Sequence, residues 1–474
     1  MNSGSPPDVH PRGAPVSDPE TPLFPSSLGS AVQETRHALD RIERLNPSIN
    51  AMICTTAEPA LRTAEALDRA AAAGEWRGLL HGMTVSVKDN VDVAGVPTTA
   101  ASVILKDNVA RTHAFVVDRL VRNGAVIVGK ANLHEWVFGP TSQSLHFGPV
   151  RNPWNTGHIA GGSSGGSGAS VAAGMCVASI GSDTAGSIRL PASFNGVAGL
   201  RPTVGRISTT GSLPVSPTFD TLGPLARRVS DVARVFAAIA GHDPRDPMSA
   251  DVPVPNFLAQ LNEPVRGLRL GIQRRWFYED LDPDIAAAME RALDVFRSLG
   301  VELVDIDLGD VQNAQQMLSF TMIPADAMRL HRERIAERAA DYGADVLMRM
   351  RLGENVSGEQ YAQAMRWMEG WRHRLRGVFQ HVDAILSPTT PATAPAAQGL
   401  DFAQAIRRIP RFSCAWPIAG IPSLAVPCGL SSDGLPMSLE LAAGWYNEPT
   451  ALRLGHAYQS LTDHHLRAAP VLHA

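Results

Sequence analysis

Apolar residues recur at helical spacing near the start of the chain and gather in short runs further along it. Residues 30–45 and 58–73 each place their apolar side chains on one face of a helix, which predicts two amphipathic helices. The first is expected to end before Pro47, because the residue before a proline disfavours the helical conformation. Short apolar runs at 83–87 and 125–128 predict two buried strands.

The middle of the chain continues this alternation of strand and helix. A glycine-rich segment at 161–168 precedes a helical run at 169–175, and a strand-like run follows at 177–180. Alternating strands and helices predict an α/β fold with a large mixed, mainly parallel sheet that is wrapped by helices. From about residue 265 to 378 the chain turns helical and rich in methionine, so we expect a helical insertion there.

The composition indicates one large globular unit. Hydrophobic residues make up 44% and charged residues 19% of the 474 positions, which excludes a mainly disordered chain. No segment resembles an internal linker, so we expect a single domain over residues 29–474. Residues 1–28 are rich in Pro and Ser and lack the apolar stretch of a signal peptide, so we expect a disordered leader and a cytoplasmic protein.

Positive and negative charges are nearly balanced. The chain has 42 Lys and Arg residues against 46 Asp and Glu, a net charge of -4, without long runs of one sign. Proteins that bind nucleic acid or an anionic membrane usually carry a basic patch or stripe. We therefore expect a small-molecule substrate as the partner, with no nucleic acid and no membrane. The four cysteines are scattered without metal-ligand spacing, which predicts reduced thiols.

Two clusters rich in serine and glycine, at 161–168 and 183–189, are together with Lys88 the strongest functional signal. A flexible linker is one alternative for the first cluster, but such linkers are unusual between structured segments. A phosphate-binding loop is another, but neither GK[ST] nor GxGxxG is present. A nucleophile elbow is the third, since residues 161–165 match G-x-S-x-G. The preceding residues 151–160 contain Pro, Gly and Asn where the elbow needs a strand, which argues against it.

The chain resembles the amidase signature family of serine hydrolases. The resemblance runs from about residue 46 to 465 and rests on four separated motifs: Val87-Lys88-Asp89, GGSSGGSGASVAAG at 161–174, GSDTAGSIRLPASFNGVAGLRPT at 181–203, and LSPTTPATAP at 386–395. It implies an α/β/α sandwich and an enzyme that cleaves the C–N bond of amides through an acyl-enzyme. It implies no metal and no organic cofactor.

The resemblance also implies a Ser-cisSer-Lys triad. Ser187 is the expected nucleophile, Ser163 the proton relay, and Lys88 the base, and the Gly162–Ser163 peptide bond is expected to be cis. The chemistry is consistent, because a serine hydroxyl needs a base before it can attack and a lysine serves as that base only when it is neutral. Burial lowers the pKa of a lysine and so favours the neutral form.

Further residues around Ser187 are expected to assist it. By resemblance, three consecutive residues form the oxyanion hole: Thr184, Ala185 and Gly186. Many relatives have glycine in place of Ala185, whereas some that act on urea-like amides share the alanine. Asp183 and Arg189 are expected to support the nucleophile loop by charge-assisted hydrogen bonds. Ser164 either joins the network or fills the tight loop.

The substrate is expected to be an amide, or a carbamate such as a urethane, that carries a bulky or aromatic group. The reason is that the segment 265–378 offers Met, Trp and Phe side chains for an apolar pocket. Two alternatives stay open. One is the A subunit of a tRNA-dependent amidotransferase, and the other is a hydrolase of urea-type amides such as allophanate or biuret.

Overall fold

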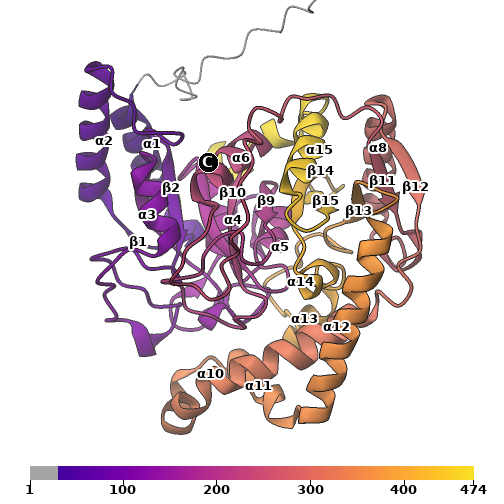
Figure 1. Ribbon diagram of the computed structural model, residues 1–474. Coiled ribbons are helices and arrows are strands. Elements are labelled where there is room, and N and C mark those ends of the chain that lie inside the picture. Colours follow the sequence, from indigo (N-terminus) through magenta and orange to yellow (C-terminus); the bar gives the residue numbers. More distant parts are fainter. Residues whose placement is uncertain (1–29, 474) are drawn as a thin grey trace, which may run out of the picture.

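One large sheet runs through the computed structural model, which describes residues 30–473, and helices surround it (Figure 1). The expected leader at 1–28 lies outside the described residues. Within them the sheet has eleven strands, in the spatial order β1 (Met52–Thr55), β3 (Val126–Ala131), β2 (Thr84–Lys88), β8 (Ala178–Asp183), β10 (Thr221–Ala226), β9 (Ala198–Arg201), β14 (Ser423–Leu430), β15 (Pro436–Ala443), β13 (Ala384–Pro388), β11 (Arg269–Ile272) and β12 (Glu302–Asp305). Two small hairpins consist of β4 (Gln143–Ser144) with β5 (Gly148–Pro149) and β6 (Arg151–Asn152) with β7 (Asn155–Ile159).

The sheet is mixed, as expected, but it is not mainly parallel. Between residues 30 and 473, six of its ten strand pairings are antiparallel. The four parallel pairings join β3, β2 and β8 near one edge and β13, β11 and β12 at the other. In the centre, β10 runs back between β8 and β9, and β14 and β15 form a hairpin that closes between Leu430 and Pro436. Strands joined by such a short connection can only pair antiparallel, whereas the sequence alternation predicted helical crossovers.

The helices lie on both faces of the sheet and below its strands in the view of Figure 1. Within the described residues the α-helices are α1 (Ala31–Ile49), α2 (Ala57–Ala72), α3 (Phe115–Arg122), α4 (Gly165–Ala172), α5 (Arg189–Asn195), α6 (Val229–Ile239), α7 (Arg274–Phe277), α8 (Pro283–Ser298), α9 (Asn313–Met317), α10 (Ile323–Arg338), α11 (Ala344–Arg351), α12 (Gly358–Val378), α13 (Phe402–Arg408), α14 (Ala415–Ala419) and α15 (Glu448–Ser460).

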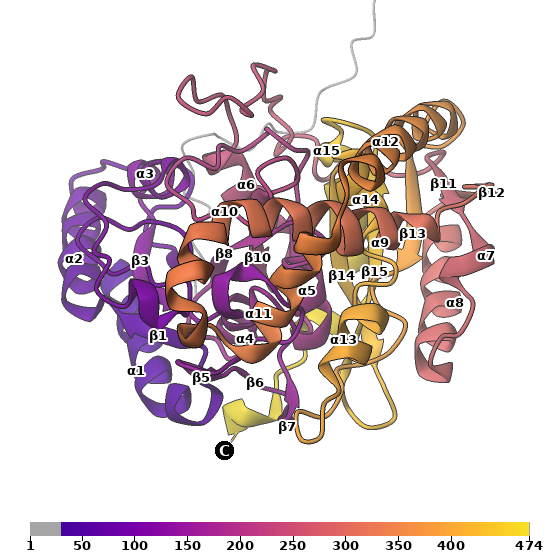
Figure 2. The ribbon, with the colours of Figure 1, turned by 90° about the horizontal axis from the view of Figure 1, so that it is seen from below.

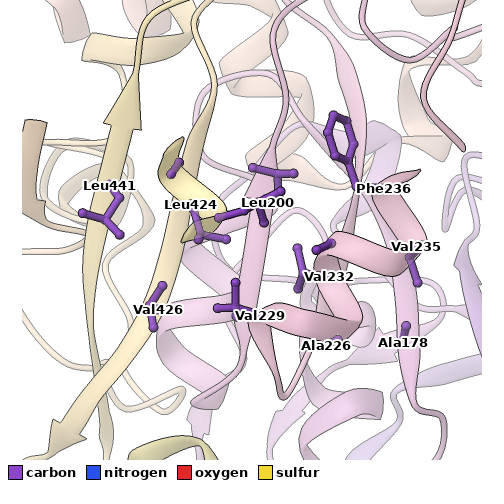
Figure 3. Packing of buried hydrophobic residues seen from close by; sticks show 14 of the residues in the cluster. Ala178, Leu200, Ala226, Val229, Val232, Val235, Phe236, Leu424, Val426 and Leu441 are labelled. Atoms are coloured by element: carbon purple, nitrogen blue, oxygen red, sulfur yellow. The ribbon is translucent and has the colours of Figure 1, made fainter. Parts of the chain in front are cut away.

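Alternate residues of the central strands point to opposite faces of the sheet. Leu424 and Val426 of β14 belong to the core that also contains the apolar faces of α3, α6, α8 and α15. Figure 3 shows both beside the α6 residues Val229 and Val232. Ala425, between them in sequence, belongs instead to the core beneath α1, α2 and α4. The sheet therefore has an apolar core on each face, which is the expected sandwich.

The first helix ends later than predicted. It begins after Ser30, as expected, but continues through Pro47 to Ile49. Proline lacks an N–H, so within the last turn it removes one helical hydrogen bond without preventing the helix from finishing. Asn50 then closes the helix in a left-handed conformation, and its N–H bonds to the carbonyl oxygen of Asn46.

The segment 265–378 is less helical than predicted. Its first part contributes β11 and β12, which form one edge of the main sheet. The edge strand 302–305 gives little sequence signal, because it is four residues long and exposed at both ends. The later part forms helices α9 to α12, and α10 and α11 cover the ends of the strands in the view from below (Figure 2). Its status as an insertion stays a prediction.

Candidate active site

Two neighbouring parallel strands bring the predicted residues together. β2 ends at Lys88 and β8 ends at Asp183, and the two strands pair in parallel through Val87 and Ile180. Parallel neighbours end at the same edge of a sheet, so residues that follow one strand meet residues that follow the other. This pairing places Lys88 beside Ser182, a contact that requires the strand register to be known.

Lys88 is fully buried and its amino group contacts serine hydroxyls only. Its Nζ atom donates to the Oγ atoms of Ser163 at 2.7 Å, Ser164 at 2.8 Å and Ser182 at 2.9 Å. Within residues 30–473 it forms no ion pair, since Asp89 next to it pairs instead with Lys130 at 2.8 Å. Burial therefore lowers the pKa of Lys88 well below its usual value, and the nearby carboxylates of Asp183 and Asp220 only partly oppose this shift.

The relay segment approaches the rest of the chain very closely. The Gly162–Ser163 peptide bond is cis, as expected. A Cβ atom on Gly162 would lie 2.7 Å from both the carbonyl oxygen of Gly139 and the nitrogen of Thr141, so only glycine fits there. Ser164 joins the network, because its hydroxyl also donates to the carbonyl oxygen of Ser182 at 3.1 Å.

Ser187 lies on the neighbouring loop, between β8 and α5. Its side chain is half-buried and lines a cavity together with Gly162, Thr184 and Ala185. Its carbonyl oxygen accepts from the N–H of Ser164 at 3.2 Å, which ties the two loops together. Within residues 30–473 its hydroxyl makes no hydrogen bond to Ser163, so the structure joins two members of the expected triad directly and places the third beside them.

The loop before Ser187 holds one of the expected oxyanion donors in another role. The N–H of Gly186 donates to Asp183 Oδ1 at 2.8 Å, which leaves it unavailable to an oxyanion in this geometry. The N–H groups of Ala185 and Ser187 have no partner within the described part of the chain and remain as candidate donors. Thr184 donates its hydroxyl to Asp220 at 2.6 Å.

Buried charges support this loop from beneath. Asp183 accepts from Arg189 Nε and Nη2, both at 3.0 Å, and from the N–H of Ile188. These contacts with Arg189, helped by Arg201, hold the pKa of the Asp183 carboxyl well below its usual value despite its burial. Arg189 also donates to Glu440 at 2.6 Å, which the sequence did not reveal because the two lie 251 positions apart. The expected supporting role of Asp183 and Arg189 thus has a geometric basis.

The cavity at Ser187 is small. Its volume is about 30 Å³, roughly the room of two water molecules. Its wall is mainly apolar, with the side chains of Val137, Phe138, Pro140, Leu190, Val215, Ile323 and Pro410, and contains no methionine. The methionines of the helical segment instead pack mostly in the core, for example Met322 and Met368. The methionines therefore do not form the wall of this cavity, against the expectation from composition.

One cation in this cavity wall, Arg349, has no direct ion-pair partner within residues 30–473, although Asp345 lies near enough to influence its charge. Arg349 of α11 is buried, donates to Ser319 Oγ at 3.0 Å and lies over the ring of Phe138 at 4.4 Å. Its Nε atom is buried without a partner, and no carboxylate pairs with it between residues 30 and 473. Burial lowers the pKa of Arg349 to about 10. The sequence did not single it out, because helical spacing alone does not tell which arginine of a helix faces a cavity.

A metal site and a membrane-spanning helix are both absent from the described residues. Among residues 30–473 no group of three or more His, Cys, Asp or Glu side chains is arranged to hold a metal ion. In the same range, no helix combines the length and the apolar character that crossing a membrane requires.

Comparisons with known proteins identify the family of the chain. The family model described as Amidase matches residues 33–452. The A subunit of glutamyl-tRNA(Gln) amidotransferase from Synechococcus sp. (strain CC9311) is 38% identical over 461 residues, which cover 92% of this chain and 94% of the relative. A solved structure described as a vestigial protein complex that reveals the evolutionary origins of an s-triazine catabolic enzyme is 35% identical, with a TM-score of 0.86 and coverage of 91% of this chain and 95% of that one. Peptide amidase from Stenotrophomonas maltophilia is 31% identical, with a TM-score of 0.78 and coverage of 91% and 93%.

These relatives correct the expectation about partners. The first is named as one subunit of an enzyme that acts on a glutamyl-tRNA, so a small-molecule substrate without nucleic acid is no longer the expected partner. The charge argument failed because the net charge of one chain says nothing about the other subunits of an assembly. None of the three names a carbamate, and the expected urethane activity finds no support in them.

Proposed function

The chain belongs to the amidase family of enzymes that act on C–N bonds, and from that premise we propose that Ser187, Ser163 and Lys88 hydrolyse a carboxamide. The observation that carries the proposal is the setting of Lys88, which is fully buried, bonded to three serine hydroxyls and unpaired with any carboxylate of residues 30–473. Burial makes such a lysine lose its proton at a lower pH than an exposed lysine does, and only the neutral form has a lone pair with which to act as a base.

The reaction follows from the order of these groups. Ser187 Oγ attacks the amide carbon while its proton passes to Ser163, whose own proton passes to Lys88 Nζ. The resulting oxyanion accepts hydrogen bonds from the N–H groups of Ala185 and Ser187. The C–N bond then breaks as the proton returns through Ser163 to the leaving nitrogen. Water, deprotonated by the same relay, hydrolyses the acyl-enzyme and regenerates the hydroxyl of Ser187.

Arg349 indicates which amide is cleaved. A buried cation without a direct ion-pair partner is costly, and a carboxylate on the substrate would supply that partner and accept from its free Nε–H. An amide that carries a carboxylate suits this wall, because Thr184, Ser187 and Ser319 line the same cavity as Arg349. Glutamine is such an amide, so the proposed role is the A subunit of an amidotransferase that releases ammonia from glutamine for a glutamyl-tRNA, as in the relative of that name.

A second candidate is a urea-type amide with a carboxylate, such as allophanate. Two observations favour it. The chain is 35% identical to the protein connected with an s-triazine catabolic enzyme, and Ala185 stands where many relatives have glycine. This candidate needs the same triad and the same use of Arg349, so it differs from the first only in the group next to the scissile carbonyl.

Ammonia release by the purified chain tests the proposal. The substrates are glutamine, 4-aminobutanamide, which is glutamine without its carboxylate, and allophanate, with Ser187→Ala as the inactive control. We expect one of the two carboxylate-bearing amides to have a kcat/KM at least tenfold above that of 4-aminobutanamide. Preference for glutamine selects the amidotransferase role and preference for allophanate the second candidate. Equal rates on all three substrates would overturn the carboxylate assignment, and full activity of Ser187→Ala would overturn the triad.

A further inference from the structure

Asp220 joins parts of the chain that form different walls of the active-site cavity. It is half-buried and directly precedes β10, and the sequence did not single it out. Its Oδ1 atom accepts from the hydroxyl of Thr184 at 2.6 Å. Its Oδ2 atom accepts from the N–H groups of Val215 at 2.8 Å and Ser216 at 3.0 Å. Thr184 and Val215 both line the cavity, so a single carboxylate holds two of its walls together.

The same carboxylate is linked to the helical segment through Ser216. The hydroxyl of Ser216 donates to Asp326 of α10, whose other oxygen accepts from Tyr361 of α12 at 3.1 Å. Ile323, three residues before Asp326 and so one turn earlier on α10, is a third wall of the cavity. The nucleophile loop, the loop before β10 and α10 are therefore joined by an unbroken chain of hydrogen bonds.

A purely local role explains only half of these contacts. An aspartate often caps the turn that precedes it by accepting backbone N–H groups, and Oδ2 does so here. Such a cap leaves the other oxygen free to face water. Oδ1 instead binds a hydroxyl 36 positions away, in the residue before Ala185, whose N–H is a candidate oxyanion donor. Arg201 does not take this place, since it donates to the carbonyl oxygen of Phe219 and to Asp183.

We propose that Asp220 is a positioning residue. Through the hydroxyl of Thr184 it holds the loop 184–187, which carries the candidate oxyanion donors, in a fixed position relative to the cavity wall at Val215 and Ile323. The inference rests on the proposed function, because it assumes that Ser187 is the nucleophile. Without the hydrogen bond between Thr184 and Asp220, the N–H groups of the loop are still present but are no longer held where the oxyanion develops. Since those N–H groups act on the transition state, the loss falls on kcat rather than on KM.

Thr184→Val is the sharpest test, because it removes only the hydroxyl and leaves the backbone contacts of Asp220 intact. We expect kcat to fall about tenfold or more, as for the loss of a hydrogen bond to a charged group, while KM changes less than about threefold. The matched control is Thr218→Val, in the same loop as Asp220, whose hydroxyl forms no hydrogen bond within residues 30–473. It should leave both constants unchanged.

Variants of Asp220 complete a double-mutant cycle. Asp220→Ala should lower kcat at least as much as Thr184→Val does, and the double variant should be no worse than Asp220→Ala alone. Asp220→Asn should restore much of the rate, because its amide oxygen can accept from the two N–H groups while its NH₂ group donates to Thr184. Additive effects, or a Thr184→Val rate equal to that of Thr218→Val, would overturn the inference. Loss of activity in Ser187→Ala in the same assay shows that such a failure belongs to Asp220 and not to the triad.

Discussion

Replacing Arg349 by methionine should change which amides the enzyme prefers. Methionine is nearly as long as arginine and apolar, so it can fill the space over Phe138 without creating a cavity. The perturbation removes the one buried cation of the cavity wall and leaves Ser187, Ser163 and Lys88 untouched. If Arg349 binds the carboxylate of the substrate, amides that carry a carboxylate lose affinity and amides without one do not.

The magnitude follows from the setting of the guanidinium group. It is buried, so a carboxylate bound to it forms a desolvated ion pair with two hydrogen bonds. Removing one partner of such a pair costs about 2–5 kcal/mol. A value of about 3 kcal/mol corresponds to a loss in kcat/KM of about 150-fold for glutamine or allophanate. Because the carboxylate keeps its charge throughout the reaction, most of this loss should appear in KM rather than in kcat.

The assay is steady-state ammonia release from a carboxylate-bearing amide and from 4-aminobutanamide, with wild type and Arg349→Met side by side. 4-Aminobutanamide, which has no carboxylate, should change less than about threefold in kcat/KM. Arg351→Met, on the same helix but exposed, is the matched control and should leave both substrates unaffected. The melting temperature of Arg349→Met should not fall, because the lost cation has no ion-pair partner in residues 30–473. Equal losses on both substrates would refute the reasoning.

Three further predictions concern the triad and its support. Ser187→Ala and Lys88→Ala should each lower ammonia release by about 10⁴-fold or more, whereas Ser163→Ala keeps a small residual rate because water can take its place; a Ser187→Ala variant with a tenth of the wild-type rate would contradict the assignment. Asp183→Asn should cost about 1.5–3 kcal/mol of unfolding free energy, since Arg189 loses its bidentate partner and keeps only Glu440; denaturant unfolding that shows less than about 1 kcal/mol would count against this. Because burial lowers the pKa of Lys88, the unfolded chain binds more protons than the folded chain. The unfolding free energy of the wild type, relative to that of Lys88→Met, should therefore rise with pH up to about pH 10.4. The rise should be at most about 1.4 kcal/mol per pH unit. The melting temperatures of the wild type and Lys88→Met, measured from pH 7 to 10, should therefore converge or cross. If the two melting temperatures change in parallel with pH, Lys88 stays charged in the folded protein.

Local sequence was enough to place the candidate catalytic residues. Lys88 follows an apolar run that could be recognised as a strand, and Ser163 lies in a glycine-rich cluster whose close approach to Gly139 and Thr141 leaves no room for side chains. Such features depend on a few consecutive residues, because strand propensity and the absence of a Cβ atom act locally. The family resemblance rests on the same short motifs, and it led to the correct fold and the cis bond at Gly162.

The surroundings of these residues were decided by tertiary structure alone. Ser182 reaches Lys88 only because β2 and β8 pair in one particular register, and Glu440 reaches Arg189 across 251 positions of sequence. The antiparallel centre of the sheet, the small cavity and the contacts of Asp220 are of the same kind. Arg349 is the clearest case, since a helix presents every residue type at the same period and only packing decides which turn faces the cavity. Short-range propensity therefore determined which reactive side chains the chain presents. Non-local strand pairing and packing determined which part of a substrate these side chains can contact.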